Sequence, residues 1–140
     1  MQHWQIQNLP KFRGGENRPI LRTNKLSFKT KIAYFSGICD SEFKLKSKPI
    51  IKVLKSVRME NCECYGIYTG TKFSHKVYEH EIKISKILNK TDICLFNTIA
   101  HEYVHCWQLE NRLPLAHDKN SGFKMWRKYF KQFYKIDLTS

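Results

Sequence analysis

The five residues His101-Glu102-Tyr103-Val104-His105 constrain this 140-residue chain more than any other part of its sequence. On an α-helix, residues four apart lie on one face, one turn apart, so the imidazoles of His101 and His105 can bind a single zinc ion. The intervening Glu102 cannot reach the metal at the same time, but it can reach a water at the metal and accept its proton. The pattern therefore predicts a helix that carries two metal ligands and a general base.

The surrounding sequence predicts such a helix over about residues 92–112, with Thr91 or Asp92 as N-cap and Pro114 as the stop. Its apolar residues fall within one half of the helical wheel: Leu95, Phe96, Ile99, Ala100, Tyr103, Val104 and Trp107. The opposite half carries His101, His105, Gln108 and Arg112. Both histidines avoid the apolar face, as metal ligands should.

A catalytic zinc site usually has a third protein ligand besides a water. The only histidine after His105 is His117, and no glutamate follows Glu110, which points elsewhere on the helical wheel. The extended motif with a third histidine six residues on is excluded, because Asn111 stands at that position. His117 is therefore the predicted third ligand, with Asp118 as the alternative.

The length of the chain predicts one domain, which we expect over residues 23–140 after an irregular arm at 1–22. Strands are predicted at residues 50–54, 64–68 and 81–84 from β-branched runs and alternation. A further extended segment is suggested by the alternate positions of Leu26, Phe28, Ile32 and Tyr34. We expect an α+β, zincin-like fold in which a short antiparallel sheet packs on the motif helix and on a C-terminal amphipathic helix.

That C-terminal helix is expected over about residues 121–135 and carries two stripes. The apolar stripe consists of Phe123, Trp126, Phe130, Phe133 and Tyr134. The basic stripe consists of Lys124, Lys128, Lys131 and Lys135. No acidic residue occurs between Asp118 and Asp137, and continuous like charge is unfavourable unless a polyanion is present. We therefore expect the basic stripe to contact nucleic acid, with a solvated surface as the alternative.

The whole chain is basic, with 25 Lys+Arg against 12 Asp+Glu and a formal net charge of +13. Such a charge favours polyanions, meaning nucleic acid or, as a weaker alternative, an anionic membrane surface. A second basic surface could be formed by Lys44, Lys46, Lys48, Lys52 and Lys55. Trp4 could stack on bases, whereas Trp107 and Trp126 are expected in the core. No apolar run has the length of a membrane helix, and the first ten residues lack the apolar core of a secretory signal.

The five cysteines are an odd number without a secretory signal, so we expect free thiols in the cytoplasm. Only one residue separates Cys62 from Cys64, and no second pair follows. A structural zinc site at this pair is the alternative to thiols that pack as small apolar side chains.

Several motifs, in order, resemble the SprT-like (Spartan-type) zinc metallopeptidases over about residues 50–134. They are the cysteine-containing strand at 62–66, the segment E-I-K-I-S-K-I-L at 81–88, the segment T-I-A-H-E-Y-V-H-C-W at 98–107, and His117 followed by Phe123. Asp118 stands where the family has a glycine after its third histidine, and Phe123 comes two residues later than the family's spacing.

The resemblance implies a peptidase with one zinc per chain on His101, His105 and His117, and with Glu102 as the catalytic base. In the best-known members it also implies DNA repair by cleavage of proteins crosslinked to DNA. The partners would then be DNA, bound without sequence preference, and a protein associated with it, in a cytoplasmic or, in a eukaryote, nuclear location. The sequence has no four-cysteine zinc ribbon, so the basic stripe would have to bind the DNA.

Two further points stay open at this level. Tyr129 and Tyr134 are both candidate donors to the oxyanion of the reaction. The competing function is a nucleic-acid-binding module with a structural zinc and no peptidase activity. A structural zinc site is closed by four protein ligands, whereas a catalytic site leaves one position for water.

Overall fold

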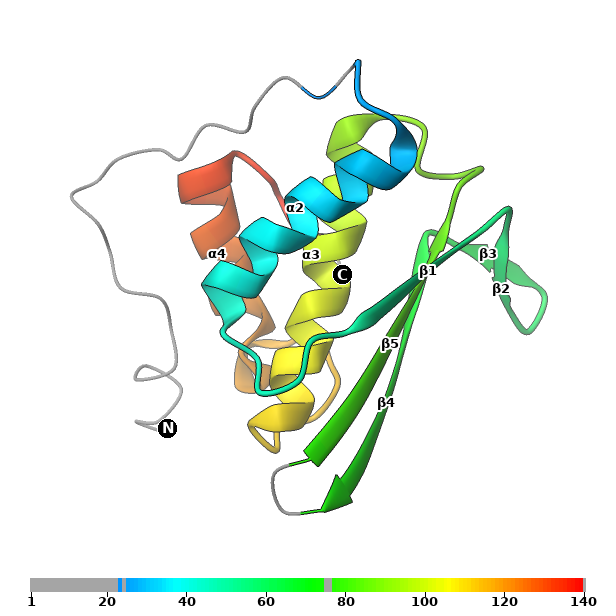
Figure 1. The fold of residues 1–140 in the computed structure, drawn as a ribbon. Helices are drawn as coiled ribbons and strands as arrows, with labels where there is room; N and C mark the ends of the chain where they lie inside the picture. The colour runs from blue at the N-terminus through cyan, green and yellow to red at the C-terminus, as the bar shows by residue number, and fades with distance from the viewer. Residues whose placement is uncertain (1–22, 24, 75–76, 140) are drawn as a thin grey trace.

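The computed structural model describes residues 23, 25–74 and 77–139, which form a mixed α+β fold (Figure 1). The elements in chain order are α2 (Phe28–Phe43), β1 (Ile50–Leu54), β2 (Val57–Met59), β3 (Cys62–Cys64), β4 (Gly66–Ser74), β5 (Val77–Ser85), α3 (Asp92–Glu110), the 3₁₀ turn η1 (Lys119–Ser121) and α4 (Phe123–Tyr134). The predicted α+β class is confirmed. The arm predicted at 1–22 lies outside the described residues.

The main sheet has the strand order β1-β5-β4, and a two-stranded sheet of β2 and β3 stands apart from it. β4 pairs antiparallel with β5, but β1 pairs parallel with β5, so the prediction of a purely antiparallel sheet is wrong. The chain reverses in the β2–β3 hairpin before it enters β4, and β5 then inserts between β4 and β1. The predicted strands at 50–54 and 81–84 are confirmed, and the one at 64–68 is divided between β3 and β4.

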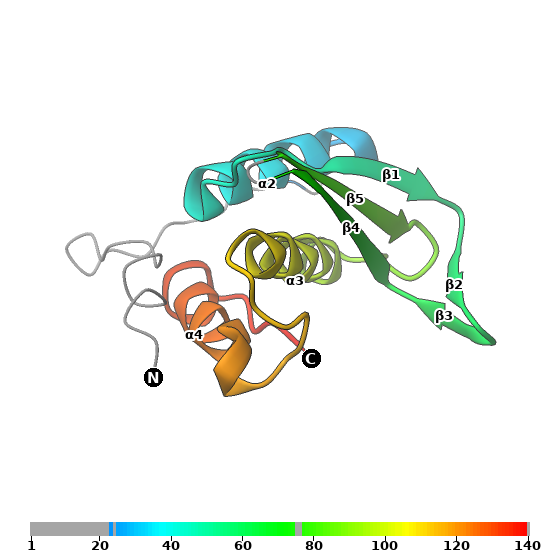
Figure 2. The same ribbon diagram turned by 90° about the horizontal axis from the view of Figure 1, so that it is seen from below.

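The sheet buries only one of its faces. Buried residues alternate with more exposed ones along β5. The buried set is Tyr78, His80, Ile82 and Ile84, and the residues between them, which are at least partly exposed, are Glu79, Glu81 and Lys83. The buried face packs on α3, which lies between the sheet and α4 in both views (Figures 1 and 2). The motif helix α3 is therefore the central element of the fold, with the sheet on one side of it and α4 on the other (Figure 2).

The first described helix corrects a prediction. Residues expected to be extended, from Phe28 onward, form α2, whose buried residues are Ile32, Phe35, Cys39, Glu42 and Phe43. These positions recur every three or four residues, which is typical of a helix, and most of them lie beyond the alternating stretch. The Ser27 side chain accepts a hydrogen bond from the Thr30 backbone N–H, which caps the helix. Phe35 then stacks on Phe96 of α3, with 4.6 Å between ring centroids.

The motif helix α3 agrees with its prediction. Thr91 is the N-cap, since its side chain accepts from the Cys94 N–H, and the helix ends at Glu110 with Asn111 as C-cap. The half of the wheel opposite the apolar face is nevertheless not open to solvent, because the sheet, α2 and α4 enclose most of the helix. His105 is 8% exposed and Gln108 is fully buried. The polar half of α3 therefore forms a buried polar site and not a surface.

The C-terminal helix α4 also agrees with its prediction. Every member of its apolar stripe is buried, and Trp126 packs edge-on against Trp107, 5.7 Å between ring centroids. The four lysines of the basic stripe are all exposed. Gly122 precedes the helix with a φ of +82°, and a Cβ there would lie 2.6 Å from the Trp107 ring, so only glycine fits this turn. Of the helices that the structure describes, none combines the length and apolar character needed to span a bilayer.

Candidate metal centre

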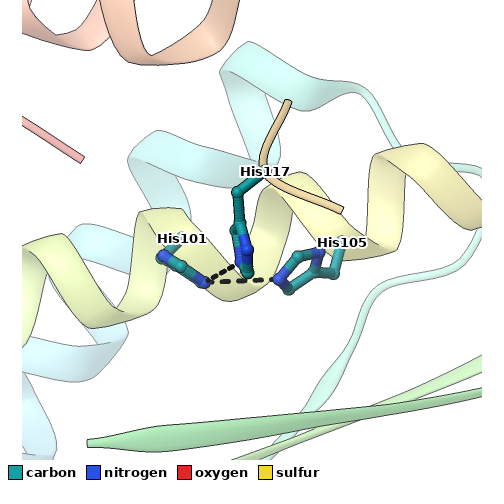
Figure 3. Close-up of side chains that lie close together, drawn as sticks. All are labelled: His101, His105 and His117. Carbon is teal, nitrogen blue, oxygen red and sulfur yellow. Dashed lines mark hydrogen bonds between the residues drawn. The ribbon is translucent and has the colours of Figure 1, made fainter. Parts of the chain in front are cut away.

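Three histidines from two parts of the chain converge at one point (Figure 3). His101 and His105 project from α3, and His117 projects from the loop between α3 and α4. The Nε2 atom of His101 lies 3.3 Å from Nε2 of His105 and 3.1 Å from Nε2 of His117. One ligand atom from each histidine lies within 4.8 Å of the other two. The three predicted ligands are therefore brought together.

The alternative third ligand is not part of this group. The carboxylate of Asp118 accepts hydrogen bonds from the backbone N–H groups of Asn120 and Ser121, both 3.0 Å long, and so caps η1. Among the described residues, no other group of His, Cys, Asp or Glu side chains is arranged to hold a metal. Cys62 and Cys64, the candidates for a second site, lie in β3 outside any such group.

Two of the three separations between the imidazole nitrogens fit a tetrahedral metal. With zinc–nitrogen bonds of about 2.0–2.1 Å, two ligands at the tetrahedral angle have their nitrogens about 3.3 Å apart. The separations of 3.3 and 3.1 Å at His101 match this value. Imidazole is a ligand type suited to zinc.

The hydrogen bonds behind His105 fix which of its nitrogens carries the proton. The Gln108 side-chain N–H₂ donates to the carbonyls of Ala116 and Ser121, at 2.8 and 3.2 Å. Its Oε1 is therefore the acceptor in the 2.7 Å contact with Nδ1 of His105. Nδ1 thus carries the proton, which leaves the Nε2 lone pair free to bind a metal ion.

The same reasoning applies to His101. Its Nδ1 contacts the backbone carbonyl of Thr139, which can only accept, so Nε2 again carries the lone pair. Two Nε2 lone pairs therefore face each other at 3.3 Å between neutral imidazoles. That contact is repulsive by itself, and a cation between the nitrogens turns it into an attraction for both rings.

The histidines also have the right charge for metal binding. Burial, reinforced by the neighbouring His105 and His117, lowers the pKa of His101 to about 4. Burial likewise lowers the pKa of His105. Both rings are therefore neutral near pH 7, which is the form that binds a metal ion.

Glu102 lies beside the histidines in a cavity of about 430 Å³, which His101 and His117 also line. Its side chain is on the buried part of α3, only 6% exposed. Burial raises the pKa of this carboxyl to about 8. A cation held by the histidines would favour the ionised form and lower that pKa. The geometry suits a general base and not a fourth ligand, because Glu102 is outside the group of converging ligand atoms.

The start of β4 approaches Glu102 closely at Gly66. A Cβ on this residue would lie 2.8 Å from the Thr98 methyl, 3.1 Å from the Lys83 carbonyl and 3.3 Å from the Glu102 carboxylate. Thr98 cannot easily move, because its hydroxyl donates to the buried Asn89, 2.7 Å away. The close approach brings the edge strand β4 to the rim of the cavity.

We expect Gly66→Ala to lower the free energy of unfolding by about 1–3 kcal/mol, because overpacking between a strand and a helix cannot relax. Chemical denaturation of the metal-free protein measures the change. Gly37→Ala is the matched control, since nothing lies within 4 Å of a Cβ there and the residue is inside α2. That control should stabilise by about 0.5–1 kcal/mol. Equal stability of Gly66→Ala and the wild type would contradict the close packing of β4 on α3.

Two residues of the site were not predicted from sequence. Gln108 connects His105 to the loop that carries His117, and Thr139 binds His101. The sequence contains a weak indication that Gln108 belongs to the site, because this residue lies on the histidine half of the helical wheel. The sequence contains no such indication for Thr139, because it is 38 residues from His101 along the chain.

The tyrosines considered as oxyanion donors lie elsewhere. The hydroxyls of Tyr129 and Tyr134 both donate to the carboxylate of Glu42 in the core, the first at 3.0 Å. Neither lines the cavity that contains Glu102. Both belong to the face of α4 that packs towards α2, so the structure does not support either in the oxyanion role.

The basic residues predicted to bind nucleic acid are available on the surface. The second basic group, Lys44, Lys46, Lys48, Lys52 and Lys55, is exposed like the stripe on α4. Lys52 forms an ion pair with Glu81, 2.8 Å long. Trp4 lies outside the described residues. No protein-family model, curated protein or solved structure was found to match this chain.

Proposed function

We propose that this chain is a zinc-dependent metallopeptidase in which His101, His105 and His117 hold one zinc ion and Glu102 is the general base. The observation that carries the proposal is the convergence of three Nε2 atoms beside a buried carboxylate, at a cavity large enough for a segment of peptide. Three imidazole ligands with a fourth position left for water are a donor set of catalytic zinc sites.

A zinc ion bound there would polarise the carbonyl of the peptide bond and lower the pKa of the attacking water. Glu102 would accept the proton of that water and pass it to the leaving amine nitrogen. Gln108 and the Thr139 carbonyl would keep the two helix imidazoles oriented. The edge strand β4 pairs with β5 alone among the described strands, so its other edge can align an extended peptide along the cavity.

We propose further that the substrate is a protein bound or crosslinked to DNA. The support is the net charge of +13 and the four exposed lysines of the basic stripe on α4. A basic helix face without acidic residues favours contact with phosphates without sequence preference. Such an activity belongs in DNA repair, with the enzyme close to DNA in the cytoplasm or, in a eukaryote, in the nucleus.

The second candidate is a nucleic-acid-binding module with a structural zinc and no peptidase activity. The same exposed lysines favour it. A structural site would be closed by a fourth protein ligand. Among the described residues, three histidines converge and Glu102 is outside their group, which supports the enzyme over the binding module.

Metal removal tests the proposed function. The zinc-loaded protein should cleave denatured casein or a lysine-rich protein adsorbed on single-stranded DNA. Cleavage should stop with 1,10-phenanthroline and return with one equivalent of zinc, because the Lewis acid is essential. Mass spectrometry should find one zinc per wild-type chain and far less in His101→Ala and His117→Ala. Stoichiometric zinc without cleavage of either protein would favour the binding module instead.

A further inference from the structure

The last described residues form an extended tail that lies on α3 beside the candidate metal centre. Ile136 and Leu138 are fully buried, whereas Asp137 and Thr139 are exposed. This alternation anchors the tail in the core every second residue. The Asp137 side chain is also held by Arg127 of α4, with 2.7 Å between Oδ1 and Nε. Burial of Ile136 and Leu138 therefore fixes the course of the tail, and the exposed ion pair adds little to it.

Asn97 of α3 binds the backbone of this tail with both ends of its amide. Its N–H₂ donates to the carbonyl of Asp137 at 3.0 Å, and its Oδ1 accepts from the backbone N–H of Thr139 at 3.4 Å. The carbonyl of the same Thr139 accepts the proton of His101 Nδ1. Asn97 and His101 are four residues apart on α3 and so lie on one face, one turn apart. Two successive turns of the helix thus bind one short piece of backbone.

The two helix imidazoles are oriented in different ways. His105 is held from behind by the side chain of Gln108, which is fully buried. His101 is partly exposed in the cavity, and the partner of its Nδ1 among the described residues is a backbone carbonyl near the end of the tail. Nothing in the helix itself keeps His101 in the tautomer that directs its Nε2 lone pair at His105 and His117.

We propose that Asn97 is a positioning residue of the metal centre. Through the backbone of residues 137–139 it holds the Thr139 carbonyl against Nδ1 of His101, which fixes the tautomer and the direction of the ring. The inference rests on the proposed function, because it takes His101 as a metal ligand. Partners behind a metal-binding histidine commonly change metal affinity by about 10–100-fold.

The contacts of the tail separate this role from a structural one. Ile136 and Leu138 stay in the core, and the ion pair of Asp137 with Arg127 stays intact, when the Asn97 amide is removed. The loss should therefore be local to Thr139 and His101. Thr139→Ala retains the carbonyl and should leave His101 unaffected, since only the backbone of Thr139 is used. Arg127→Ala removes an exposed contact to the same tail and should have little effect, as is usual for surface ion pairs.

The experiment reads the tautomer of His101 in the metal-free, ¹⁵N-labelled protein by long-range ¹H–¹⁵N correlation spectra of the imidazoles. The wild type should show His101 protonated at Nδ1. Asn97→Ala and the nearly isosteric Asn97→Asp should show the other tautomer or a mixture, with His105 unchanged as the internal reference. Zinc affinity, measured by chelator competition, should fall by about 10–100-fold in both variants and stay near wild type in Thr139→Ala and Arg127→Ala.

The readouts fail in distinguishable ways. A wild type that binds no zinc overturns the proposed function, while the tautomer of metal-free His101 still tests the positioning role. If both Asn97 variants keep the wild-type tautomer and zinc affinity, the positioning role is overturned and the metal site stands. Circular dichroism establishes whether each variant is folded. If Asn97→Ala fails to fold, the nearly isosteric Asn97→Asp still tests the proposal.

Discussion

Glu102→Gln should lower the rate of peptide-bond hydrolysis by about 10²–10⁴-fold while the protein keeps one zinc per chain. Glutamine has nearly the same shape as glutamate but cannot accept a proton from the attacking water. It also removes no metal ligand, because Glu102 lies outside the group of converging histidine nitrogens. Burial raises the pKa of the Glu102 carboxyl to about 8, so the site already accommodates a neutral side chain. Replacement by neutral glutamine should therefore leave the stability of the fold unchanged. Initial rates with a fluorogenic peptide and the zinc content of the purified variant give the two readouts.

Glu79→Gln is the matched control, since Glu79 is exposed on β5 next to the buried Tyr78 and His80. It makes the same chemical change away from the cavity, and it should retain the wild-type rate. Hydrolysis by Glu102→Gln at the wild-type rate would remove the general-base assignment. Loss of zinc from Glu102→Gln would instead reassign this carboxylate as a ligand.

Replacement of the four lysines of the basic stripe on α4 by glutamate should weaken DNA binding by more than about 10-fold, if three or four phosphate contacts are lost. The four side chains are exposed and lie off the buried apolar stripe, so the fold and the metal centre should remain intact. Wild-type binding should weaken steeply with salt, because phosphate contacts release counterions. Titration of labelled single- and double-stranded oligonucleotides at low and moderate salt measures both effects.

A second variant with the same change of net charge, made outside α4, distinguishes an effect of the basic stripe from an effect of the total charge. Lys25, Lys29, Lys72 and Lys90 are exposed and lie outside α4. Their replacement by glutamate should reduce the affinity less than the change on α4 does. Equal losses in the two variants would show that only the total charge matters. If the wild-type affinity is insensitive to salt, the alternative holds that the basic stripe is only a solvated surface.

The local features of this protein could be predicted from its sequence. The 92–112 helix follows from its N-cap signal and its periodic apolar residues, and the observed bounds differ only at the C-terminal end. The relation of His101, Glu102 and His105 follows from the geometry of one turn of helix. His117 followed by elimination, because no other histidine comes later in the chain. In each case the deciding interactions lie within a few residues or depend on residue type alone.

The wrong predictions concern features that depend on partners in space. The alternation around Phe28 favoured an extended segment, but packing of Phe35 on Phe96 selects a helix there. The direction of β1 depends on where β5 inserts, and a short apolar run carries no information on direction. The hydroxyls of Tyr129 and Tyr134 donate to Glu42 of α2, and the sequence of α4 alone does not show that this partner lies next to them.

By itself, the sequence determined that His101, Glu102 and His105 are candidate ligands and base, because an α-helix of fixed pitch places such residues side by side whatever the rest of the chain does. Only the tertiary structure decided how those residues are oriented and how polar their surroundings are. The sheet and α4 enclose the histidine half of α3, and this burial shifts the pKa values of His101 and Glu102. Gly66, Gln108 and the Thr139 carbonyl reach the site from separate parts of the chain, and hydrogen bonds and close packing between such parts exist only after the chain has folded.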